Sequence, residues 1–342
     1  MHHIGLFDMM LPAFVECVLL SGILCYLGLH VIRREIIFVD LALAQIAAMG
    51  ATIGIIMGMA PHSIATWVFS LLFTAIGAAI FSVSRVEDER VPQEAVIGLI
   101  YAISAATVVL LVAKAPHGAE HIKEMLVGAI IWVKWPTIAM SAVVFPLVGV
   151  LHVVFGSKFL AISQAPGEAF ASKMHVRLWD FLFYLTFGFV ITVAVRTAGV
   201  LLVFVLLVVP AIAAMLLARR FAHQLAIGWI GSAVAGLVGL VSSYYADLPA
   251  GPSVAVVFAL CLILLGVVLY IIRADRPREA MSNVGLVSTG VGVVLVGLFF
   301  FGRFLGNSPL AASRSEVEQM RIRQAQIENV QREGPAEEEG GR

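Results

Sequence analysis

Ten apolar runs, each about 20 residues long, follow one another along this chain of 342 residues. A helix needs roughly 20 apolar residues to cross a bilayer, and only helices or closed barrels satisfy their backbone hydrogen bonds there. The chain is 61% hydrophobic and 13% charged, unlike a soluble domain. We therefore predict an all-α, polytopic membrane helix bundle with spans near 11–31, 38–58, 63–83, 94–113, 137–156, 179–196, 199–218, 224–245, 253–272 and 284–302.

The loops between these runs differ in charge. If successive spans alternate in direction, one side of the membrane receives twelve cations and the other receives five before the polar tail. Basic residues collect on the cytoplasmic side, so we expect the twelve-cation side inside and the N-terminus outside. The twelve are Arg33, Arg34, Arg85, Arg90, Lys158, Lys173, Arg177, Arg219, Arg220, Arg273, Arg276 and Arg278, and the five are Lys114, Lys123, Lys134, Arg196 and Arg303.

Several function classes are disfavoured by what the sequence lacks. The 22 basic and 22 acidic residues cancel, so no basic face for nucleic acid is expected. Cys17, Cys25 and Cys261 have no CxxC spacing and are expected to be small core residues. No GxxxxGK[ST] phosphate loop and no catalytic elbow is present. We expect no enzyme, no covalently bound cofactor, and no ATP hydrolysis by this chain itself. The N-terminus has no basic signal-peptide region, so the first run should stay as a helix.

Three segments carry motifs. The first helix ends in His30-Val31-Ile32-Arg33-Arg34 and leads into IIFVDLALAQIAAMGATIG at 36–54. AGVLLVFVLLVVPAIAAMLLARRF fills 198–221, and ADLPAGPSVAVV fills 246–257. In this order and spacing they resemble the permease subunit of the bacterial ABC importers for zinc, manganese and iron, over about residues 10–275.

That resemblance implies the domain organisation and the place of the chain. Residues 1–275 would form the permease transmembrane domain of about nine spans, in a multi-pass protein of the bacterial inner membrane. Residues 276–303 would add one extra transmembrane helix. The polar stretch 304–342 is expected to be a partly disordered tail, outside the membrane if the last run spans. Contact of this tail with a binding protein is one hypothesis for its role.

The resemblance also implies a substrate and partners. A divalent metal ion would be the transported substrate, and ATP would bind a separate cytoplasmic ABC ATPase. An extracytoplasmic metal-binding protein would deliver the metal, and a second copy of the chain would complete the pathway across the lipid bilayer. The cytoplasmic stretch 162–180, helical from Pro166 onward, falls where the family docks its ATPase, with Gly167, Glu168 and Ala169 at the beginning of that helix. An ordinary amphipathic connector is the alternative.

Ionisable side chains inside spans are candidates for the metal pathway, because a cation needs ligands to cross hydrocarbon. Asp40 and Gln45 open the second span. The family signature commonly places an acidic residue and a histidine four apart, whereas positions 41 and 45 are Leu41 and Gln45 and the carboxylate comes one residue early. Alternatively Asp40 pairs with Arg33 or Arg34. Glu16, inside the first span, is protonated, paired or functional, and His30 is expected to cap carbonyls or meet headgroups.

Two further segments have candidate roles. His117, Glu120, His121 and Glu124 lie in the stretch 114–136, which reads as a partly re-entrant or surface helix, so either an outer metal contact or a solvated helix face fits. Pro210 removes a hydrogen bond in mid-span, which suits a gate or an inert packing kink. Asp247 begins the acidic-x-Pro-x-Gly-Pro-Ser motif, in which 249–252 predicts a tight outer turn.

Three alternative functions remain open from the sequence. A siderophore- or cobalamin-type ABC permease would need a wide cavity for a bulky ligand. An ion-coupled secondary carrier would show internal symmetry between its halves, and none is evident on inspection. A membrane scaffold would use its 304–342 tail to recruit a partner and would tolerate changes in 162–180.

Overall fold

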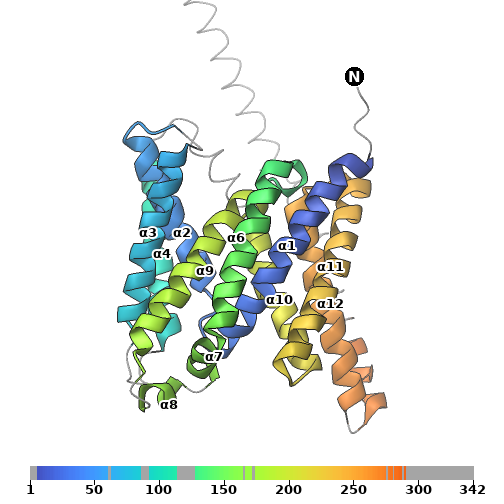
Figure 1. Cartoon of the computed structure of the whole chain (residues 1–342). Helices are drawn as coiled ribbons and strands as arrows, with labels where there is room; N and C mark the ends of the chain where they lie inside the picture. Colours follow the sequence, from blue (N-terminus) through green and yellow to red (C-terminus); the bar gives the residue numbers. More distant parts are fainter. Residues whose placement is uncertain are drawn as a thin grey trace, which may run out of the picture. The chain divides into compact units, whose positions relative to one another are not determined.

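The computed structural model describes residues 6–60, 63–85, 92–113, 128–164, 166–171, 174–274, 276–279, 281–286 and 289. The chain divides after Leu265 into two compact units, 1–265 and 266–342. The first unit contains the helix bundle (Figure 1). In the second, the described residues form the end of one long helix and short helical stretches at 277–279 and 281–286.

Nine of the ten predicted spans are confirmed as helices in the described part of the chain, each long and apolar enough to cross a membrane. Their ends lie within a few residues of the predicted runs, apart from the first helix, which begins earlier. The tenth run, 284–302, lies mostly outside the described residues, as does the tail. No strand occurs among the described residues. The helices are α1 Leu6–Arg33, α2 Val39–Ile56, α3 Ile64–Val83, α4 Gln93–Val112, α6 Trp135–Val154, α9 Val176–Ala198, α10 Val200–Leu217, α11 Phe221–Ala246 and α12 Ala250–Arg273.

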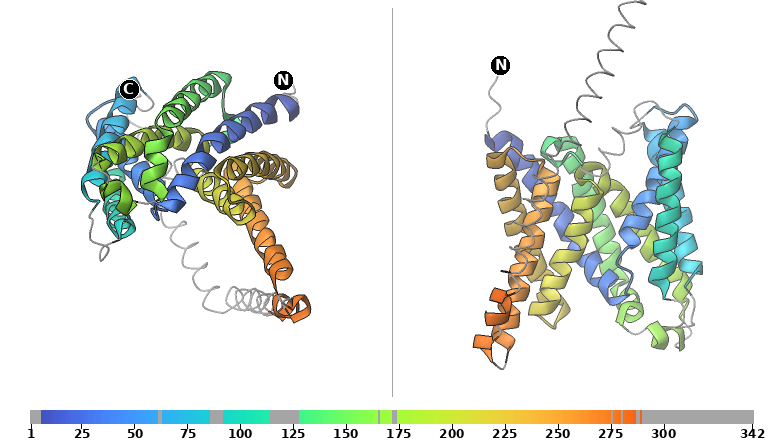
Figure 2. Two further views of the ribbon diagram at one scale, coloured as in Figure 1. Left: turned by 60° about the horizontal axis from the view of Figure 1, so that its bottom comes forward. Right: turned by 180° about the vertical axis from the view of Figure 1, so that it is seen from behind.

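In the described parts of the connecting segments there are three short helices. The 3-10 helix η1, Ile130–Trp132, precedes α6, whereas residues 114–127 of the predicted re-entrant segment lie outside the described residues. Helices α7, Gly156–Gln164, and α8, Pro166–Ala171, follow α6 and lie at one end of the bundle (Figure 2). The helix predicted from Pro166 onward is therefore present. Proline is favoured in a first helical turn because its missing N–H has no partner there.

Two groups of helices make up most of the bundle. Helix α2 packs against α3, α4 and α9, while α1 packs against α6, α10 and α11 (Figure 1). The contact of α1 with α10 is very close: a Cβ on Gly28 would lie 2.0 Å from the carbonyl oxygen of Leu207. Small residues of this kind let membrane helices approach closely.

The turn between α11 and α12 differs from the prediction. The chain turns at 247–249, where Asp247 has a φ of 51° at the C-terminus of α11. Residues 250–252, which we expected to belong to the turn, form the first turn of α12 instead. Pro252 fits there because the first-turn N–H groups have no partner within the helix. The Ser243 hydroxyl donates a hydrogen bond of 2.6 Å to the Leu248 carbonyl and so holds the turn against α11.

Two expectations about individual buried residues were wrong. His30 does not cap carbonyls or face headgroups: it is 1% exposed, and its Nδ1 lies 2.9 Å from the Ser163 hydroxyl. Cys17 and Cys25 are buried as expected, but Cys261 is exposed on α12. The exposed face of α12 is apolar, because in a membrane the lipid, rather than another helix, can cover it.

Candidate functional site: a pocket between four spans

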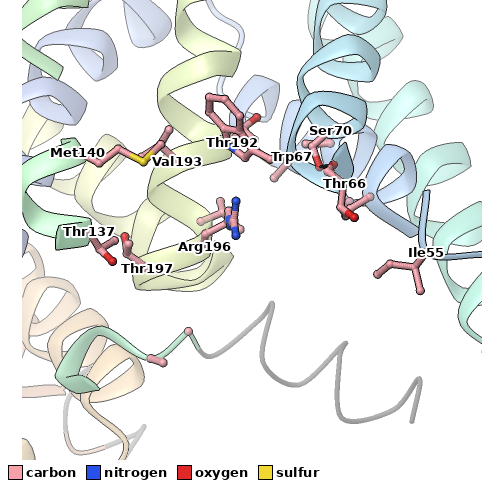
Figure 3. A pocket seen from close by; sticks show the side chains of 17 residues that line it. Ile55, Thr66, Trp67, Ser70, Thr137, Met140, Thr192, Val193, Arg196 and Thr197 are labelled. Atoms are coloured by element: carbon pink, nitrogen blue, oxygen red, sulfur yellow. Dashed lines mark hydrogen bonds between the residues drawn. The ribbon is translucent and has the colours of Figure 1, made fainter. Parts of the chain in front are cut away.

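A pocket of about 560 Å³ lies within the first unit between α2, α3, α6 and α9 (Figure 3). This volume is typical of a site for a small ligand. Its polar lining comes from hydroxyl groups on three helices, the guanidinium of Arg196 and the indole of Trp67. The hydroxyls belong to Thr66, Ser70, Thr137, Thr192 and Thr197.

The pocket begins at the end of the bundle that is predicted to face outside, here called the outer end. Ile55 lies at the end of α2, Thr66 in the first turn of α3, and Arg196 in the last turn of α9. The loop at Gly128 and Ala129 also lines it. This loop is held against the end of α9, because the Ala129 N–H donates a 3.2 Å hydrogen bond to the Thr197 carbonyl.

One face of α2 forms the deep wall of the pocket. Ala44, Ala48, Ala51 and Ile55 are spaced by four, three and four residues and therefore share a face of the helix. At 1.5 Å per residue, this wall extends about 16 Å along the helix. That is roughly half of the 30 Å hydrocarbon core of a bilayer. The pocket thus runs from the outer end toward the middle of the predicted membrane.

Asp40 continues this face beyond the pocket, one turn before Ala44. Its side chain is buried, with the residue 2% exposed, and its Oδ1 has no hydrogen-bond partner among the described residues. The alternative pairing with Arg33 or Arg34 is not found: Arg33 donates to Gln224 at 2.5 Å and Arg34 pairs with Asp180 at 2.8 Å. Asp40 is therefore a buried carboxylate whose Oδ1 is able to accept a further hydrogen bond or to bind a cation.

Gln45 lies beside this face without lining the pocket itself. It is 7% exposed and follows Ala44, the deepest lining residue of α2. The structure thus places Asp40 and Gln45 on the same helix at the inner limit of the pocket. It does not give them a common face, as their spacing of five residues already indicated.

Glu16 is paired with a neighbouring helix. It is 0% exposed, and the Ser141 hydroxyl of α6 donates a 2.8 Å hydrogen bond to its Oε1. Its Oε2 has no partner among the described residues. Glu16 does not line the pocket, but it lies next to two residues near its wall, Ser141 of α6 and Thr197 of α9.

The other candidates lie apart from the pocket. Pro210 is buried within α10, and Asp247 ends α11; neither lines the pocket. Gly167 and Glu168 are exposed on α8 and Ala169 is buried. The cluster of His117, Glu120 and His121 lies outside the described residues. Among the described residues, no group of three or more His, Cys, Asp or Glu side chains is placed to hold a metal ion.

Sequence reasoning missed the pocket residues of α3 and α9. Arg196 was counted only as a loop cation, and the hydroxyl residues were counted as ordinary members of apolar runs. Trp67 has a buried Nε1 with no hydrogen-bond partner among the described residues. Polar residues spaced by four along α3, at Thr66, Ser70 and Thr74, were the signal that was available.

Comparison with known proteins gives the family. The model of the ABC 3 transport family matches residues 6–269. The manganese transport system membrane protein MntC of Listeria innocua is 24% identical over 246 residues, which cover 70% of this chain and 82% of the relative. The high-affinity zinc uptake system membrane protein ZnuB of Haemophilus influenzae is 24% identical over 263 residues, covering 76% and 97%.

A solved structure shares the fold. PsaBC from Streptococcus pneumoniae in complex with Fab matches with a TM-score of 0.63 at 20% identity, covering 82% of this chain and 97% of the other. The family model matches most of the chain, in agreement with the motif resemblance. The nine candidate spans among the described residues also fit a membrane transport protein. This multi-pass membrane protein therefore belongs to the ABC 3 transport family.

Proposed function

We propose that this chain is the membrane-spanning permease subunit of an ATP-driven importer of a divalent metal ion. Relatives named for manganese, zinc and iron transport support this class of substrate. The observation that carries the proposal is the single face of α2, where a pocket open toward the outer end leads to the buried carboxylate of Asp40.

The chemistry of this face suits weak, exchangeable binding of a cation. Hydroxyl and carboxylate oxygens are ligands for hard cations, and an importer must also release what it binds. The positive charge of Arg196 opposes a cation at the outer end, so the better ligands lie deeper, at Ser70 and Thr192 in the pocket and at Asp40 beyond it. Because the oxygen atoms along this path belong to hydroxyl groups and a carboxylate, we expect manganese or ferrous iron to be preferred over zinc.

Transport by this chain would require partners. ATP would bind a cytoplasmic ABC ATPase docked on α8, whose Gly167 and Glu168 are exposed. A metal-binding protein would deliver the ion at the outer end, and a second copy of the chain would complete the pathway. Alternating access driven by the ATPase would then open the pocket outward before hydrolysis and inward afterwards.

Metal uptake tests this proposal directly. Cells that express the chain with its cognate ATPase and binding protein should accumulate manganese or iron from a panel of manganese, iron, zinc and cobalt ions, and cells without the chain should not. If an assembled complex that hydrolyses ATP moves none of the four, the metal assignment is wrong and a bulkier organic ligand replaces it.

A matched pair of variants tests whether the pocket is the pathway. Ala48→Trp fills the pocket, and we expect uptake to fall at least about tenfold with unchanged membrane assembly. Ala102→Trp introduces the same side chain on the exposed face of α4 and should keep uptake within about twofold. Equal uptake in the two variants would remove the pocket from the pathway.

A further inference from the structure

A buried ion-pair network joins three helices at the end opposite the pocket, here called the inner end. The two carboxylate oxygens of Asp180 are used separately: Arg34 Nη1 donates to Oδ1 at 2.8 Å, and Arg85 Nη1 donates to Oδ2 at 2.6 Å. The side chains of Arg34, Arg85 and Asp180 are 1%, 9% and 0% exposed. Arg34 follows α1, Arg85 follows α3, and Asp180 lies near the start of α9.

Arg34 also holds α7. Its Nε donates to the Ser163 hydroxyl at 2.8 Å and its Nη2 to the Phe159 carbonyl at 3.4 Å. The guanidinium carbon lies 3.9 Å from the centre of the Phe183 ring. Burial lowers the pKa of Arg34, and the charge of Asp180 opposes that shift. One side chain thus ties the last turn of α7 to the ends of α1 and α9.

The position of this network links two surfaces of the permease. Only residue 165 separates α7 from α8, which carries the exposed Gly167 and Glu168. Two of the three helices that meet at Asp180 reach the pocket at their other ends: α3 supplies Thr66, Trp67 and Ser70, and α9 supplies Thr192, Val193 and Arg196 (Figure 3). The network thus connects α7 to the two helices that form these walls of the pocket.

Stability alone is a weak reason for such a network. Buried ion pairs lose much hydration, and apolar residues of similar volume often stabilise a fold as well or better. What fixed donors and acceptors add is a defined arrangement of the parts they join, with rigid elements carrying the coupling. The bidentate geometry of arginine suits this role, since one guanidinium holds several acceptors at once.

We propose that Arg34, Asp180 and Ser163 form a transmission joint that converts movement of the α7–α8 connection into movement of the pocket walls on α3 and α9. These are positioning residues, because none of them lines the pocket. The proposal rests on the proposed function in one respect, namely that an ATPase acts on α8.

The transmission joint is tested by measuring how fast a water-soluble reagent reaches the pocket. Ser70→Cys places a thiol in the pocket wall of α3, and its rate of labelling by a water-soluble maleimide is followed in the complex with the cognate ATPase, with and without ATP. The same complex without Ser70→Cys corrects for Cys17, Cys25 and Cys261. In the Ser70→Cys background we expect ATP to change the labelling rate about tenfold.

Ser163→Ala removes the shorter of the two hydrogen bonds from Arg34 to α7, leaving the 3.4 Å bond to the Phe159 carbonyl and both ion pairs of Asp180 in place. Arg34→Lys keeps the charge but cannot hold all three acceptors. In either variant we expect ATPase binding and basal ATP hydrolysis to stay within about twofold, while the effect of ATP on labelling falls to about one. Glu279→Gln, which removes an exposed ion pair of 2.8 Å with Arg276, is the matched control and should respond to ATP normally.

Each outcome decides between the proposals. If ATP changes the labelling rate equally in Ser163→Ala, in Arg34→Lys and in the control, the proposal of a transmission joint is wrong. The proposal that an ATPase acts on this chain is then still supported. If these variants no longer bind the ATPase, the contacts serve docking and the joint is likewise wrong. If ATP has no effect even in the Ser70→Cys background, ATPase action on this chain fails, and the joint fails with it.

Discussion

At the scale of single residues, three buried acidic side chains differ in what surrounds their carboxylate groups. Glu16 accepts a hydrogen bond from Ser141, and Asp180 is paired with two arginines. Asp40 is equally buried, and Glu16 Oε2 and Asp40 Oδ1 both have no hydrogen-bond partner among the described residues. Asp40 differs from Glu16 because it continues the face of α2 that lines the pocket. A buried carboxylate oxygen without a hydrogen bond costs free energy, and ionisable groups inside membrane proteins commonly serve function rather than stability.

The substitution Asp40→Asn should therefore reduce transport without reducing the stability of the fold. We expect uptake to fall at least about tenfold, because the charge that attracts the cation is lost. The midpoint of thermal unfolding should stay the same or rise, because a neutral amide is cheaper to bury than a charge. Uptake and thermal unfolding are measured on the same preparation, with Glu279→Gln as the exposed control. Full uptake by Asp40→Asn would remove this residue from the pathway.

At the scale of elements, backbone approach decides which glycines matter. Gly28 and Gly22 lie on the same helix, α1, and the sequence does not distinguish them. A Cβ on Gly28 would meet the Leu207 carbonyl of α10 at 2.0 Å, whereas a Cβ on Gly22 would meet nothing within 4 Å. Gly199 lies between α9 and α10. Its φ of 79° is a conformation that residues other than glycine rarely adopt.

Gly28→Ala should loosen the contact between α1 and α10. We expect a loss of about 1–3 kcal/mol, since an added methyl group against rigid backbone forces the helices apart. Gly22→Ala, the matched control, should keep or slightly increase stability because alanine favours helix. Denaturation of the purified chain in detergent measures both. A Gly28→Ala variant as stable as Gly22→Ala would mean that the two helices are not packed this closely.

At the scale of the whole molecule, the charge of the loops predicts the orientation in the membrane. The ion pairs of Asp180 bring Arg34 and Arg85 to one end of the first unit, as alternation of the spans requires. The pocket opens at the other end. An importer needs this arrangement, because its substrate arrives outside and its ATPase acts inside.

Labelling of intact cells checks this orientation. Leu248→Cys, in the exposed turn before α12, should react with a membrane-impermeant maleimide, because that turn is expected outside. Glu168→Cys, exposed on α8, should react only after the cells are opened. The parent chain controls for the exposed Cys261. The reverse pattern would invert the orientation and move the pocket to the cytoplasmic side.

The sequence by itself determined the spans, their approximate ends and the family. Runs of about 20 apolar residues allow little but membrane helices, since each helix satisfies its own backbone hydrogen bonds in lipid. Pro166 correctly predicted the start of α8, and the motifs around Asp40 and Pro210 predicted the family. These features depend on short stretches of sequence, so they can be predicted without knowing which other segments pack against them.

Only the tertiary structure decided which polar residues meet. Asp180 contacts Arg34 and Arg85, which lie 146 and 95 positions away in sequence. Thr66, Ser70 and Thr192 converge on one pocket although each lies in an apolar run. The physical reason is that hydrophobicity selects helices but not their rotation or partners in lipid, where packing of small residues and pairing of buried polar groups decide both.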